Sequence, residues 1–142
     1  MRTLQTAGLI TLLTLASSGL AADQLAPCPD SPNCVSSQAG NTNQRVEALH
    51  YADDTATANK RLLSVLKNMD RTTIQHADAL SIRAEVRSAF FGFVDDLTFY
   101  FDAPGVIQVR SASRLGYADF GVNRQRVEEI RTRFNSTAGS AL

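Results

Sequence analysis

The chain of 142 residues has 14 basic and 14 acidic residues, a formal net charge of zero, and a length that predicts one domain. Such an even balance of positive and negative charge excludes a general attraction to nucleic acid or anionic membranes. Any basic function must therefore be local.

The first 21 residues have the pattern of a secretory signal peptide. Arg2 gives a positive start, residues 7–15 form an apolar run, and small residues lead to Ala21, after which we expect cleavage. An uncleaved anchor is the alternative, but the run is shorter than the roughly 20 residues that span a bilayer. The mature chain, with 13 basic and 14 acidic residues, is expected in the periplasm or secreted, without a membrane span.

The two cysteines lie in a segment predicted to be loop, residues 22–45. Cys28 and Cys34 predict a disulfide bond in an oxidising compartment, since the prolines and turn-forming residues between them bring the ends together. Their spacing is not that of a redox-active Cys-x-x-Cys pair. The two histidines, His50 and His76, lack ligand spacing to the cysteines, so we predict no metal site and no cofactor.

The predicted α+β domain, residues 46–135, begins with a short strand and a helix. Residues 45–51 alternate in polarity, as a half-buried strand does. Residues 53–69 repeat apolar side chains at helical spacing, and Asp54 or Thr55 can cap this helix. The side chains that we expect in the core are those of Leu62, Val65, Leu66 and Met69.

Four strand candidates and a second helix follow. The strand candidates are residues 71–77, 80–88, 90–102 and 105–113. No segment between them is long enough for a crossover helix, so they predict an antiparallel meander. Residues 124–134 predict a helix with Val127, Ile130 and Phe134 on one face, and residues 136–142 a disordered tail. The predicted fold class is α+β, an antiparallel meander of about four to five strands with two helices packed on one face.

Side-chain alternation places Asp95 on the inward face of its strand. That face is defined by apolar residues, namely Phe91, Phe93, Leu97, Phe99 and Phe101. An unpaired buried carboxylate is costly, so either a bulge near Gly92 or Asp95 shifts the register, or an arginine pairs with Asp95 inside. We prefer the bulge. Because adjacent strand residues face opposite ways, Asp95 and Asp96 are predicted to be structural polar residues and not an acid–base pair.

Arginines gather at the start of the last helix. If Asn123 is the N-cap, Arg124 and Arg126 occupy the first turn, where the helix dipole disfavours cations. An anion is therefore expected nearby. It is either Asp119 of the chain itself or an external carboxylate, phosphate or sulfate bound at the helix start.

Two interpretations of the arginines stay open. In the first, they satisfy Asp119 or Asp95 within the fold, and the sheet arginines form cross-strand ion pairs on a solvated face. In the second, they frame an anion-binding pocket through bidentate contacts. The predicted ligand-binding residues are Arg110, Ser111, Ser113, Arg114, Tyr117, Asp119, Asn123 and Arg124.

The mature chain carries three ordered motifs, CPDSPNCVSS, FVDDLTFYF and RSASRLGYADFGVNRQRVEEIR. Together they resemble the domain-of-unknown-function 1499 family over nearly all of the mature chain. The resemblance implies a small exported or membrane-associated bacterial protein with plant plastid relatives, and it supplies no activity, cofactor or catalytic residue. It implies that a set of residues matters jointly, for folding or for binding: Cys28, Asn33, Cys34, Asp95, Asp96, Arg110, Ser111, Ser113, Arg114, Gly116, Asp119, Gly121, Asn123 and Arg124.

The sequence thus predicts a non-enzymatic binding or accessory protein of the periplasm or envelope. Its expected partner is an anionic small molecule, a lipid head group or an envelope protein. One alternative is a hydrolase-type enzyme that uses Asp95, Asp96 or Asp119 with arginines stabilising negative charge, although no nucleophile elbow is visible. Another is a structural protein-interaction module. The export signal and the interspersed acidic residues argue against nucleic-acid binding.

Overall fold

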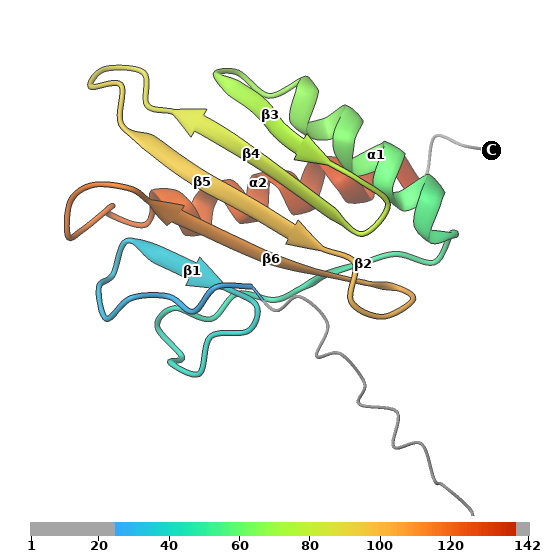
Figure 1. The fold of residues 1–142 in the computed structure, drawn as a ribbon, viewed down its shortest axis with the longest axis horizontal. Helices are drawn as coiled ribbons and strands as arrows, with labels where there is room; N and C mark the ends of the chain where they lie inside the picture. The colour runs from blue at the N-terminus through green and yellow to red at the C-terminus, as the bar shows by residue number, and fades with distance from the viewer. Residues whose placement is uncertain (1–24, 139–142) are drawn as a thin grey trace, which may run out of the picture.

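The computed structural model describes residues 25–138, which form an antiparallel sheet with two helices on one face (Figure 1). The predicted signal peptide, residues 1–21, lies outside the described residues. The strands are β1 (Cys34–Ser36), β2 (Leu49–His50), β3 (Thr72–Ala77), β4 (Ser81–Arg87), β5 (Val94–Tyr100) and β6 (Val106–Ser113), and the helices are α1 (Thr55–Lys67) and α2 (Val122–Ala138).

The sheet confirms the predicted meander. Strands β3, β4, β5 and β6 are neighbours in chain order, and each pair is antiparallel. Both β1 and β2 pair with the remaining edge of β6, which raises the number of strands to six. The segment 22–45, predicted to be loop, therefore contributes an edge strand.

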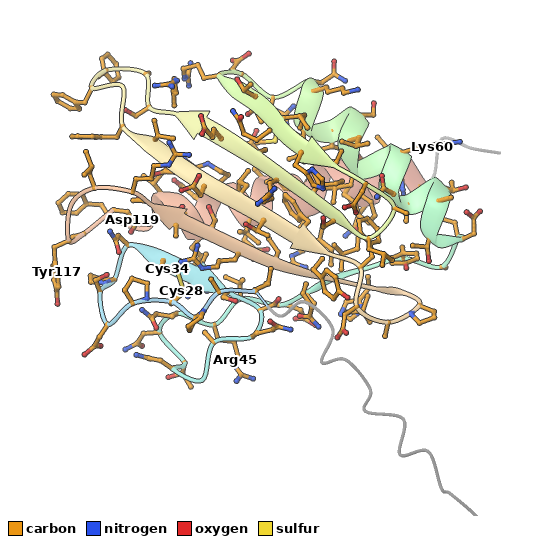
Figure 2. The ribbon with its side chains drawn as sticks, in the orientation of Figure 1. Cys28, Cys34, Arg45, Lys60, Tyr117 and Asp119 are labelled. Carbon is orange, nitrogen blue, oxygen red and sulfur yellow. A yellow bond between two sulfur atoms is a disulfide. The ribbon has the colours of Figure 1, made fainter. Side chains whose placement is uncertain are left out.

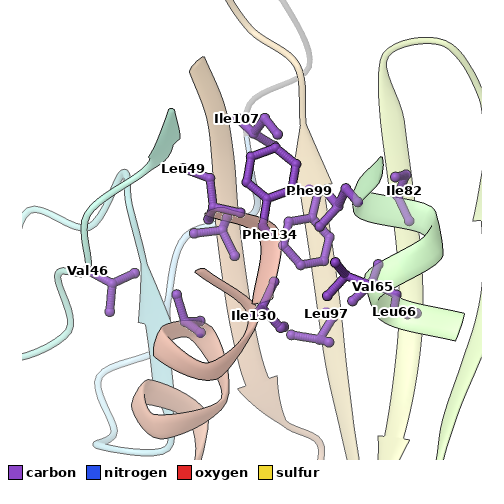
Figure 3. Packing of buried hydrophobic residues seen from close by; sticks show 14 of the residues in the cluster. Val46, Leu49, Val65, Leu66, Ile82, Leu97, Phe99, Ile107, Ile130 and Phe134 are labelled. Carbon is purple, nitrogen blue, oxygen red and sulfur yellow. The ribbon is translucent and has the colours of Figure 1, made fainter. Parts of the chain in front are cut away.

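The core lies between the sheet and the two helices (Figure 3). Asp54 caps α1, as one of the two predicted caps, by accepting a hydrogen bond from the backbone N–H of Thr57 at 2.9 Å. The predicted apolar faces are confirmed, because the buried residues of the helices include Leu62, Val65, Leu66, Val127, Ile130 and Phe134. Met69 packs against this cluster and is partly buried. Arg61 adds a cation–π contact, with its guanidinium carbon 4.0 Å from the ring centroid of Phe134.

Strand β5 begins four residues later than predicted, at Val94. The backbone N–H of Ser88 donates to the carbonyl of Phe93, and Ser88 Oγ accepts from the backbone N–H of Phe93. These bonds close a turn whose Gly92 has a φ of +65°, a value that favours glycine. The prediction that Phe91 and Phe93 face the core is therefore wrong, and both are exposed together with Phe90.

Helix α2 is longer at both ends than the predicted residues 124–134. It continues through Ala138, so the first three residues of the predicted tail are helical, and residues 139–142 lie outside the described residues. Within residues 25–138, neither helix has the length and apolar character that a membrane span requires.

Candidate functional site

The predicted disulfide bond between Cys28 and Cys34 is present, with the two Cα atoms 5.6 Å apart (Figure 2). It ties the N-terminal segment to the first residue of β1, which pairs with Ala112 of β6. Asn33, next to Cys34, donates from Nδ2 to the carbonyl of Gly116 at 2.6 Å. The first and third sequence motifs therefore lie against each other.

Asn123 is the centre of a buried polar network. Its Oδ1 accepts hydrogen bonds from Ser111 Oγ at 2.6 Å and from Arg126 Nη1 at 3.0 Å. Its Nδ2 lies within donor distance of the carbonyl of Asn33 at 3.2 Å and of Ser113 Oγ at 2.9 Å. Because Asn123 is fully buried, these contacts satisfy a side chain that would otherwise be costly inside the protein.

Arg126 extends this network to Asp95, in the second motif. The distance between Arg126 Nη2 and Asp95 Oδ2 is 2.6 Å, and the two side chains are only 10% and 9% exposed. Strand β5 keeps a regular register with β4 and β6 through Asp95, so the bulge that the sequence led us to prefer is wrong. The alternative is confirmed: Asp95 faces inward and an arginine neutralises it.

Asp119 supplies the anion at the start of α2. Its carboxylate accepts hydrogen bonds from the backbone N–H groups of Gly121 at 2.9 Å and Asn123 at 3.0 Å, and from Asn123 Nδ2 at 2.7 Å. Burial raises the pKa of Asp119, but these hydrogen bonds outweigh it and hold the pKa below its usual value. Asn123 thus lies inside the first turn, and Asp119 provides the capping carboxylate instead.

Arg124 holds a loop, and it forms no ion pair with a carboxylate of residues 25–138. It donates to the carbonyls of Arg45 at 2.9 Å and Asn43 at 2.8 Å. Together with Asp119 it also lines a small hollow of ≈ 230 Å³. Backbone tethering therefore explains its place in the first turn without an external ligand.

Arg114 lies on the sheet face opposite the helices. Glu85 and Asp96 are direct cross-strand neighbours there, a like-charge pair that is unfavourable alone. Arg114 contacts Asp96 in bidentate fashion, at 2.9 and 2.7 Å, and also donates to Glu85. These hydrogen bonds raise the pKa of Arg114 above its ordinary value. The ion pairs expected on this face thus centre on Arg114.

Arg110 lies between Ser36 and Thr98 on the same outer face. Burial lowers the pKa of Arg110, and attraction by Asp96 opposes that effect. Its Nε is buried and has no hydrogen-bond partner within residues 25–138. Tyr117, by contrast, is in the loop between β6 and α2, where it is exposed (Figure 2).

The eight predicted ligand-binding residues are therefore not gathered at one pocket. Ser111, Ser113, Asp119 and Asn123 share the buried network. The remaining four are divided between the outer sheet face, the β6–α2 loop and the contact of α2 with residues 43–45. Ligand binding by these residues stays a prediction.

A cleft of ≈ 540 Å³ opens where the start of β3 and the end of β4 meet the first turns of α2. We call it the arginine cleft, because its lining includes Arg71, Arg87, Arg126 and Arg133, with Asp70, Asp95 and Glu129 as the acidic members. None of these four arginines is among the predicted ligand-binding residues. No local pattern marks Arg71 or Arg133, since one immediately precedes β3 and the other lies on the solvent side of α2; the tertiary fold brings them together.

The candidate catalytic carboxylates are engaged in structural contacts. Asp95 pairs with Arg126, Asp96 with Arg114, and Asp119 caps α2. In residues 25–138, no cluster of three or more His, Cys, Asp or Glu side chains is placed to hold a metal ion. The arrangement supports binding and folding more directly than proton transfer.

Comparison with known families gives one match, to the model described as Protein of unknown function (DUF1499), over residues 24–134. No curated protein and no solved structure matches the chain. The matched range contains all three sequence motifs, the disulfide and the whole Asn123 network.

Proposed function

The chain belongs to the DUF1499 family of proteins of unknown function, and for this member we propose a non-enzymatic binding or accessory role in the periplasm or envelope. The proposed activity is the binding of an anionic group, such as a phosphate, sulfate or carboxylate, in the arginine cleft. The composition of the cleft is the observation that carries the proposal: four arginines and three acidic residues line it.

The charges in the arginine cleft are not equally engaged. Arg126 is paired with Asp95 at 2.6 Å, and Arg133 with Glu129 at 2.7 Å. The side chain of Arg71 donates instead to a backbone carbonyl, that of Arg87, at 3.1 Å. Its remaining guanidinium N–H groups suit the planar, bidentate recognition of a carboxylate or phosphate.

The buried network supports this proposal indirectly. Ser111 and Asn123 both contact Arg126 Nη1, at 3.3 and 3.0 Å, while Asp95 holds Nη2. Arg126 is thus fixed in one orientation at the cleft, which reduces the entropy that a ligand must overcome on binding. In this proposal the predicted residues Ser111 and Asn123 position the site and do not contact the ligand. The cleft volume lies within the range usual for small-molecule sites.

A thermal-shift titration of the oxidised mature protein tests this function. Phosphate, sulfate, dicarboxylates and sugar phosphates are added separately to the wild type, to the double variant Arg71→Asn/Arg133→Gln and to Arg83→Gln. Arg71 has a φ of 55°, and asparagine tolerates this backbone conformation. Arg83 is the matched control, since it is an exposed arginine of β4 that does not line the cleft.

We expect a concentration-dependent rise in Tm for the wild type and the Arg83→Gln control, and none for the folded double variant. The same rise in all three proteins would place the anion elsewhere and contradict the proposal. So would the absence of any rise in the wild type across these anion classes.

A further inference from the structure

Two loops at one end of the sheet expose large apolar side chains. The first is residues 88–93, between β4 and β5, and the second is residues 114–121, between β6 and α2. We call them together the aromatic end. Phe90 is 91% exposed, Phe91 79% and Phe120 99%, and the exposed set is completed by Phe93, Leu115 and Tyr117.

The two loops lie side by side. In the antiparallel meander, the end of β4, the start of β5 and the end of β6 meet at the same edge, as Figure 1 shows. The backbone N–H of Arg114 donates to the carbonyl of Val94 at 3.0 Å. Phe93 precedes Val94 and Leu115 follows Arg114, so this hydrogen bond holds Phe93 and Leu115 near each other. The rings of Phe91 and Phe93 also pack, with centroids 5.6 Å apart.

The exposed position of Phe120 comes at a cost to the backbone. Phe120 has a φ of 54°, an unfavourable conformation for a bulky side chain. Almost all of its surface faces solvent, so no packing within the described residues offsets that strain. Such an arrangement points to a contact made with something outside the chain.

Charge at the aromatic end is also arranged unevenly. Residues 88–93 and 115–118 contain no charged side chain. The acid that follows, Asp119, turns its carboxylate towards backbone N–H groups of its own helix start. Arg87 immediately precedes the first loop; its side chain is 60% exposed, and its Nη2 lies 4.0 Å from Oε2 of Glu85. The end therefore presents apolar, uncharged tips with a cation at their base.

We infer that the aromatic end docks onto an anionic lipid bilayer. The aromatic tips enter the interfacial region, where rings are favoured at head-group level, and Arg87 attracts the anionic head groups. Nearly fully exposed tips on two separate loops suit insertion among lipid head groups. This inference goes beyond the proposed function, because it needs no small ligand and rests on phenylalanines that do not line the arginine cleft; Arg87 belongs to both surfaces.

Co-sedimentation with vesicles tests the inference on the oxidised mature chain. The vesicles are pure phosphatidylcholine or equal parts of phosphatidylcholine and phosphatidylglycerol. The variants are Phe90→Ser/Phe91→Ser and Arg87→Gln, with Leu80→Ser as the matched control. Leu80 is an exposed leucine at the β3–β4 turn, the opposite end of the sheet. Thermal melts check that each variant is folded. Because all of these side chains are exposed, their substitution is expected to leave the fold intact.

The wild type and the Leu80→Ser control are expected to sediment with the phosphatidylglycerol vesicles and far less with phosphatidylcholine alone. The double phenylalanine variant should lose about tenfold or more in partitioning, and Arg87→Gln about fivefold. The inference is overturned if the wild type stays in the supernatant or if Leu80→Ser loses as much as the phenylalanine variant. A wild-type dimer in gel filtration that the phenylalanine substitutions disperse would also overturn it, by assigning this surface to a second copy.

Discussion

At the scale of single residues, the pairing of Asp95 with Arg126 decides how the inner face of the sheet accommodates a charge. Alternation along the strand correctly predicted that Asp95 faces inward, but it could not identify the partner, which lies 31 residues later. The partner depends on where α2 crosses β5, and that is a property of packing. A bulge would have removed the need for a buried ion pair, but the protein has that ion pair between Asp95 and Arg126.

Arg126→Met is expected to lower the free energy of unfolding by about 3–5 kcal/mol, because it leaves the Asp95 carboxylate buried and unpaired. Adding Asp95→Leu should recover most of that loss, since replacing both charges with apolar groups is often neutral. Urea denaturation of the two variants and the wild type measures both effects. If the single variant is as stable as the wild type, Asp95 is not held inside by Arg126.

A second residue-scale prediction concerns the cap of α2. Asp119→Ala should destabilise the protein by about 0.5–2 kcal/mol near neutral pH, as expected for loss of a capping side chain. The pKa of Asp119 is lower in the folded state than in the unfolded chain. Its contribution is therefore fully present above about pH 4 and is lost as the pH falls through the lowered pKa.

Unfolding free energies of the wild type and Asp119→Ala, measured from neutral pH downwards, should thus converge in acid. A difference that stays constant below this range would show that the Asp119 carboxylate has no stabilising charge-dependent role. Asp119→Asn is the control, since it keeps the shape of the side chain while removing its charge.

At the scale of secondary structure elements, helical periodicity and strand alternation predicted most of the fold. Both helices bury the predicted apolar faces, and β3, β4 and β6 start and end within about two residues of their predicted bounds. The sequence predicts an earlier start for β5 because Phe90, Phe91 and Phe93 suit a strand, whereas the hydrogen bonds between Ser88 and Phe93 make these residues a turn. The sequence does not predict β1, because a strand of three residues is too short to show alternation. This strand forms because its backbone pairs with the edge of β6.

The disulfide gives a prediction for this edge. Cys28→Ser/Cys34→Ser should lower the free energy of unfolding by about 2 kcal/mol, because so short a ring restricts the unfolded chain only modestly. Amide hydrogen exchange at Val35 should quicken more than at Phe99 in the middle of the sheet, since β1 is a short strand at the edge of the sheet, beside β6.

Reduced wild type is the control for the double serine variant and should show the same stability. Equal unfolding free energies for the oxidised wild type and the variant would contradict a stabilising role of the Cys28–Cys34 bond.

At the scale of the whole molecule, the candidate site was only partly predictable. The sequence indicated that residues around the start of α2 act together, and four of the eight named residues do share one network. Strand alternation does place Arg110 on the face opposite Ser111, but it could not show that Arg114, beyond the end of β6, reaches the same outer face. Nor could it find the arginine cleft, whose members run from Arg71 to Arg133 and meet only when β3, β4 and α2 are assembled.

A phosphate titration of residues 22–142, followed by NMR of the backbone amides, tests whether the arginine cleft binds an anion. Saturable chemical-shift changes are expected at Arg71, Ser88, Gln125 and Arg126, which line the cleft. Changes confined to Asn43, Phe120 and Arg124 would place the anion in the smaller hollow, and a flat titration would leave phosphate without a site. Either result would contradict phosphate binding in the arginine cleft.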